Sequence, residues 1–148
     1  MTNFDRTAAW LHACGKGKTV PNLSVQVGCH IEEFIELFDA FELSNEMDQR
    51  ILGSALKEMA YVARKLKAGT TVAHLLKEKR EDALDSLCDQ EVTGNGIAYL
   101  ADFDKATADQ RVLDSNDAKL VDGKPVILAG GKIGKPEGWV APNLSDCV

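Results

Sequence analysis

A long stretch without proline is the feature that most constrains how this chain can fold. Residues 24–114 contain no proline and few glycines. Since proline breaks the interior of a helix, the stretch favours several helices in succession. Residues 115–148 differ, because they hold three of the four prolines and five of the twelve glycines. They predict turns, short extended pieces and a tail.

Apolar residues in the proline-free stretch follow helical spacing. Ile31, Phe34 and Phe38 stand at i, i+3 and i+7, on one face of a helix. Ser44 predicts the N-cap, and Gly69 the end, of the next helix. The predicted helices contain the apolar stripes at about residues 4–11, 31–41, 47–66, 71–100 and 104–113. Weak helix formers at residues 25–28 would form the first turn of the second helix.

These patterns predict one all-α domain over residues 1–148, a length that fits a single domain. Short connections favour antiparallel neighbours, so we expect a helical bundle of about four main helices. Residues 1–23 would form an N-terminal helix and loop. Residues 24–114 would form the main helices, and residues 115–148 a short, glycine-rich, irregular tail.

Charge balance and cysteine usage limit the function classes. The chain has 23 acidic and 17 basic residues, a net charge of −6, which argues against a nucleic-acid partner. No apolar run could span a membrane, and the first residues carry no secretory signal. The four cysteines are scattered, so we expect reduced thiols in a cytoplasm. Cys29 and Cys88 are expected to be half-buried on helices.

Two acidic strips depart from the ordinary amphipathic pattern. In each, three carboxylates repeat at helical spacing beside an apolar stripe, and no basic residue follows within one turn. The strips comprise Glu32, Glu33 and Glu36, and Asp82, Asp85 and Asp89. The simpler interpretation of one strip alone is a solvated acidic face. Two strips on facing helices would instead form a pocket of oxygen ligands, which suits Mg²⁺ or Mn²⁺.

The order of these carboxylates resembles a known signature. Glu32-Glu33-x-x-Glu36 followed by Asp82-x-x-Asp85 resembles the EExxE…ExxD pattern of the MazG-like all-α nucleoside triphosphate pyrophosphohydrolases. The chain is most similar to their phage-type branch, described as phosphoribosyl-ATP pyrophosphohydrolase-like, which includes the MazZ-like enzymes. The resemblance covers roughly residues 23–144, most of the chain.

The resemblance has two departures. Asp82 stands where the family has Glu, so Glu81 is an alternative ligand. In addition, 45 residues separate Glu36 from Asp82, more than the spacing usual in the family.

The resemblance implies roles for the two strips and the tail. Glu32 would orient or deprotonate the attacking water. The implied metal ligands are Glu33, Glu36, Asp82 and Asp85, with Asp89 as a further ligand or a partner of one. The β and γ phosphates would be received by Asn116, Lys119, Lys132 and Lys135.

The function implied is hydrolysis of a (d)NTP to a (d)NMP and diphosphate, dependent on Mg²⁺ or Mn²⁺. We expect dGTP or GTP as substrate, ahead of dUTP or another dNTP. The resemblance also implies a homodimer or homotetramer in the cytoplasm of a bacterial or phage-infected cell. Two alternatives are a non-catalytic nucleotide-binding helical module and an acidic interaction protein, neither of which would release diphosphate.

Overall fold

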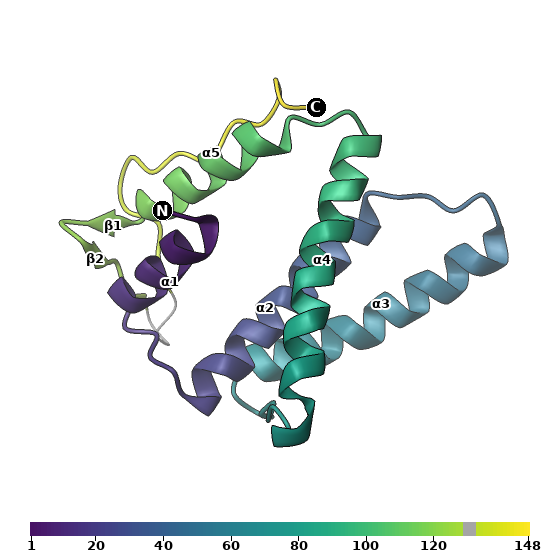
Figure 1. Cartoon of the computed structure of the whole chain (residues 1–148), viewed down its shortest axis with the longest axis horizontal. Coiled ribbons are helices and arrows are strands. Elements are labelled where there is room, and N and C mark those ends of the chain that lie inside the picture. The colour runs from purple at the N-terminus through teal and green to yellow at the C-terminus, as the bar shows by residue number, and fades with distance from the viewer. Residues whose placement is uncertain (129–132) are drawn as a thin grey trace. The chain divides into compact units, whose positions relative to one another are not determined.

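The structure is a computed structural model that describes residues 1–128 and 133–148 and is mostly helical (Figure 1). The predicted predominance of helices is confirmed. The chain divides into two compact units, each described by itself below. One unit is Lys18–Leu76, and the other combines Met1–Gly17 with Lys77–Val148. The prediction of a single domain stays a prediction.

The Lys18–Leu76 unit is a pair of helices, α2 (Val20–Asp39) and α3 (Glu46–Lys67). The side chain of Thr19 caps the first amides of α2, and Pro21 stands in its first turn, where a missing N–H costs nothing. The helix therefore starts earlier than predicted, and the expected boundary at residue 23 falls inside it. The N-cap of α3 is Asn45 and not the predicted Ser44.

The two helices approach closely at Gly28 of α2. A Cβ atom added there would lie 2.9 Å from the carbonyl oxygen of Ala63 and 3.1 Å from the Cβ of Leu66. Ala63 and Leu66 are buried at this crossing, and Leu56, about two turns nearer the N-terminus of α3, is buried as well. The small residue on α2 thus allows the helix contact that holds this unit together.

The segment after α3 is where the sequence prediction fails. The helix ends as predicted at Gly69, whose φ of 69° suits a residue without a side chain. Residues 71–76 are not helical, although a helix was predicted from near Thr71. Their backbone is held by Ser24, whose hydroxyl accepts a hydrogen bond of 2.8 Å from the Ala73 amide. The next long helix begins only at Arg80, after a 3₁₀ turn.

The second unit contains α1 (Asn3–Ala13), the 3₁₀ turn η1 (Lys77–Lys79), α4 (Arg80–Leu100) and α5 (Lys105–Asp117), followed by the two-residue strands β1 (Leu120–Val121) and β2 (Lys124–Pro125). Helix α5 begins where predicted, because the Asp104 side chain caps the Thr107 amide, but it extends beyond Leu113. The strands form a hairpin, as expected of a region of turns and short extended pieces.

Helix α5 is the centre of this unit, because both ends of the chain pack along it (Figure 1). Helix α1 runs in the same direction as α5. Near its start the Arg6 guanidinium donates to the side chains of Gln110 and Asp114, and one turn later the Trp10 indole donates to the carbonyl of Asn116. The C-terminal segment returns in the opposite direction. Its contacts with α5 start at Trp139 and end where the carbonyl of Cys147 accepts a hydrogen bond from the Asp104 amide.

Cysteine burial differs from expectation at one position. Cys29 is half-buried on α2, as predicted, whereas Cys88 is exposed on α4. Cys14 and Cys147 are buried, and none of the four cysteines, all of them among the described residues, forms a disulfide. No helix in the part of the chain that the structure describes has the length and apolar character needed to cross a membrane.

Candidate functional site

The first acidic strip lies on α2, within the Lys18–Leu76 unit. Glu32 is half-buried and forms an ion pair with Lys67 of α3. This bond is the main reason that the pKa of Lys67 is raised above its ordinary value. Glu33 and Glu36 are exposed, and neither forms an ion pair with a described residue. The strip is therefore partly compensated, by a lysine from a neighbouring helix that the local spacing did not reveal.

The second acidic strip lies on α4, within the other unit. Asp82 forms an exposed ion pair of 2.7 Å with Lys79, three residues earlier. Asp85 and Asp89 are exposed and outside the ion pairs of the described residues, and Glu81 is exposed as well. The carboxylate oxygens of Asp85 and Asp89 are thus available to a ligand from outside.

The predicted metal site is not assembled within either strip. Among residues 1–128 and 133–148, no group of three or more His, Cys, Asp or Glu side chains is arranged to hold a metal ion. The donor chemistry fits a hard cation, since every predicted ligand is a carboxylate. The assignment of Mg²⁺ or Mn²⁺ to these residues stays a prediction.

Three of the four predicted phosphate-binding residues do come together, around Trp139. The Nζ atoms of Lys119 and Lys135 lie 5.5 Å and 4.4 Å from the centroid of the indole ring. Lys119 also donates a hydrogen bond of 2.8 Å to the Oδ1 atom of Asn116. The fourth candidate, Lys132, lies outside the described residues. We call Asn116, Lys119, Lys135 and Trp139 the indole–lysine cluster.

Two tryptophans hold this cluster in place at the end of α5. The Nε1 atom of Trp139 donates to the carbonyl of Ser115, and that of Trp10 donates to the carbonyl of Asn116. Carbonyls in the last turn of a helix lack partners within the helix. The Trp139 indole supplies one for Ser115, and the Trp10 indole adds to the bond that the Asn116 carbonyl accepts from the Lys119 amide. Trp10 thus anchors α1, and Trp139 anchors the tail.

Electrostatics within the indole–lysine cluster are unfavourable in the absence of an anion. Partial burial lowers the pKa of Lys119, and the positive charge of Lys135 lowers it further. Neither lysine forms an ion pair with any described residue. The helix C-terminus and the indole ring offset part of this cost, because both attract cations.

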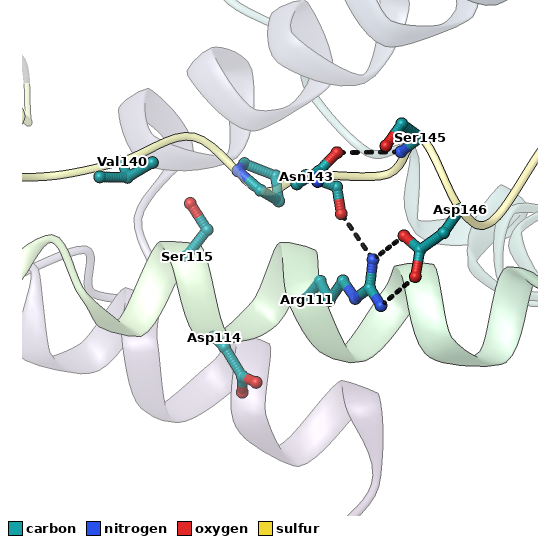
Figure 2. A pocket seen from close by; sticks show the side chains of 8 residues that line it. Arg111, Asp114, Ser115, Val140, Asn143, Ser145 and Asp146 are labelled. Atoms are coloured by element: carbon teal, nitrogen blue, oxygen red, sulfur yellow. Dashed lines mark hydrogen bonds and ion pairs between the residues drawn. The ribbon is translucent and has the colours of Figure 1, made fainter.

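A pocket beside α5 is lined by Arg111, a cation that already forms an ion pair within the protein. Figure 2 shows Arg111 reaching from α5 to the tail, where it donates to the carbonyl of Asn143 at 2.8 Å and to both carboxylate oxygens of Asp146. These bonds hold the pKa of Asp146 at about 2. Arg111 is thus paired with a carboxylate of the protein itself.

Comparisons with known proteins do not assign the chain to a family. No model of a protein family matches it, and no curated protein or solved structure does.

Proposed function

We propose that the chain is a metal-dependent nucleoside triphosphate pyrophosphohydrolase. The observation that carries the proposal is the carboxylate order Glu32-Glu33-x-x-Glu36 and Asp82-x-x-Asp85. It is supported by the exposure of Glu33, Glu36 and Asp85, whose oxygens form no ion pair with a described residue. The indole–lysine cluster adds support, because it gathers cations that suit a phosphate chain.

In this reaction a water oxygen bonds to the α phosphorus, and the bond from that phosphorus to the α–β bridging oxygen breaks. The electron pair leaves with the diphosphate, and Glu32 accepts the proton of the water. Mg²⁺ or Mn²⁺, when bound by the strips, would neutralise the triphosphate and polarise its oxygens. Glu32 must exchange Lys67 for the water before it can act as the base.

The substrate proposed is dGTP or GTP, ahead of dUTP or another dNTP, on the strength of the resemblance to the phage-type branch. The same resemblance underlies the proposals of a homodimer or homotetramer and of a cytoplasmic location. Light scattering tests the first of these, and a monomer would refute it.

A second candidate is a nucleotide-binding module without catalytic activity. The ion pairs Lys67–Glu32 and Lys79–Asp82 favour it, because they engage two of the six carboxylates of the strips with the protein's own cations. Such a module would bind a triphosphate and leave it intact.

One assay separates these functions. The protein is incubated with each NTP and dNTP in Mg²⁺, in Mn²⁺ and in EDTA, and diphosphate and orthophosphate are measured separately. We expect metal-dependent release of diphosphate, lost in Glu36→Gln and retained in Glu42→Gln, which removes an exposed carboxylate outside the strips. Binding without release would favour the module, and equal activity of the two variants would contradict the enzyme proposal.

A further inference from the structure

Hydrogen bonds fix two members of the indole–lysine cluster, Trp139 and Lys119, and the exposed Lys135 lies over the ring of the first. Trp139 is half-buried, and its position is fixed by the bond from its Nε1 atom to the Ser115 carbonyl. Lys119 is half-buried as well, and its ammonium group is held by the Oδ1 atom of Asn116. That bond leaves the NH₂ group of Asn116 as a further donor.

The cluster places two like charges against one ring although the chain has an excess of acidic residues. With 23 acidic residues against 17 basic ones, a carboxylate partner would be easy to supply. The neighbouring cation Arg111 has such a partner in Asp146, on the same tail. Lys119 and Lys135 have none among the described residues. An anion from outside would relieve both the repulsion between the lysines and the burial cost of Lys119.

We propose that the indole–lysine cluster binds inorganic diphosphate without a metal ion. Two ammonium groups and an amide offer hydrogen-bond donors to the two linked phosphates of diphosphate. Orthophosphate, with a single phosphate, would engage only some of these donors. The choice of diphosphate among the polyanions rests on the proposed function, whose product it is.

Trp139 supplies the measurement, because the chain has only two tryptophans. In Trp10→Phe, Trp139 is the single indole fluorophore, and circular dichroism checks that the variant is folded. Its emission is followed while sodium diphosphate is added in EDTA at constant ionic strength. Calorimetry of the unmodified chain, under the same conditions, measures binding without depending on fluorescence.

We expect a saturable change that orthophosphate produces only at about tenfold or higher concentration. Lys119→Gln and Lys135→Gln, each made in the otherwise unmodified chain so that the Trp10–Asn116 bond is kept, should weaken the diphosphate binding measured by calorimetry about tenfold. Lys124→Gln removes the same charge from an exposed position in the β1–β2 hairpin and should leave the binding unchanged.

Two results would overturn the inference. One is the absence of saturable diphosphate binding by both methods. The other is equal weakening by Lys124→Gln, which would indicate a general response to net charge. Hydrolysis of a triphosphate without metal-free diphosphate binding would reject this inference alone. Diphosphate binding by a chain that hydrolyses no triphosphate would reject the enzyme proposal and leave the binding site established.

Discussion

Lys67 on α3 forms an ion pair with Glu32 on α2, and the two residues stand 35 positions apart in the sequence. The pair gives Glu32 two different explanations. Glu32 either stabilises the packing of α2 on α3 through this ion pair, or serves as a general base that Lys67 keeps in position. The two roles are distinguishable, because either residue can be changed to break the same pair.

Glu32→Gln and Lys67→Met should therefore differ in activity but not in stability. Both side chains are partly exposed, so loss of the ion pair should lower the free energy of unfolding by at most about 1 kcal/mol in either variant. Removing a general base should lower turnover about 10²–10⁴-fold, an effect expected for Glu32→Gln alone. Diphosphate release and urea unfolding measure the two quantities. Equal losses of turnover would mean that Glu32 acts only through the ion pair.

Ser24→Ala should destabilise the protein and loosen the segment that follows α3. Ser24 is 1% exposed, and its hydroxyl accepts from the Ala73 amide and donates to the Val20 carbonyl, both at 2.8 Å. Without the hydroxyl, the Ala73 amide loses its partner, at a cost of about 1–3 kcal/mol. Urea unfolding gives the stability, and hydrogen exchange at Ala73 gives the local effect.

Ser54→Ala is the matched control, since Ser54 is exposed on α3. It should unfold at the same urea concentration as the unmodified chain or at a slightly higher one. Unchanged exchange at Ala73 in Ser24→Ala would show that the hydrogen bond does not hold the segment.

Gly28→Ala should destabilise the protein, whereas Gly53→Ala should stabilise it. Both glycines are inside helices of the same unit, so alanine improves helix propensity at each by about 1 kcal/mol. At Gly28 the new methyl group would meet the Ala63 carbonyl at 2.9 Å, whereas nothing lies within 4 Å of the corresponding position at Gly53. Overpacking costs about 1–3 kcal/mol, enough to reverse the gain at Gly28. Chemical denaturation checks the sign, and equal stabilisation by both changes would rule out a close contact at Gly28.

The Arg111–Asp146 pair should make stability depend on acid pH. The bond from Arg111 holds the pKa of Asp146 at about 2 in the folded chain, below its ordinary value of 3.8. The pair therefore stabilises the fold above about pH 4, and the contribution disappears as pH falls towards 2. The difference in unfolding free energy between the unmodified chain and Asp146→Asn should shrink over that range.

Asp122→Asn serves as the control for this titration, because Asp122 is exposed and forms no ion pair with a described residue. Its stability should follow that of the unmodified chain at every pH. A constant difference for Asp146→Asn from pH 6 to pH 2 would show that the pair does not contribute through its charge.

Local patterns in the sequence predicted helix positions correctly where the residues of the helix itself determine the structure. The apolar spacing around Phe34 predicted the body of α2, and Gly69 predicted the end of α3 through a conformation that glycine adopts readily. The start of α4 was predicted wrongly because the apolar spacing continues through residues 71–76. The Ala73 amide instead donates to Ser24, a partner 49 positions earlier that no local pattern contains.

In the candidate site, too, contacts between residues close in the sequence could be predicted, and contacts between distant segments could not. Asn116 and Lys119 are three residues apart on the chain, so their contact could be predicted from spacing. The role of Trp139 as the ring against which two lysines lie depends on the tail folding back along α5, which sequence periodicity does not encode. Lys67 was missed as a partner of Glu32 for the same reason.

The packing of both chain ends on α5 has a consequence for synthesis. Arg6 meets Gln110, 104 positions later, and the tail closes over the same helix from the other direction. At about 5–20 residues per second, the ribosome needs several seconds to deliver α5 after α1 has been made. During that interval the Lys18–Leu76 unit, in which α2 packs against α3, can form before α1 has its partner. A nascent chain arrested before α5 should therefore protect α2 and α3 from protease and leave α1 open to cleavage.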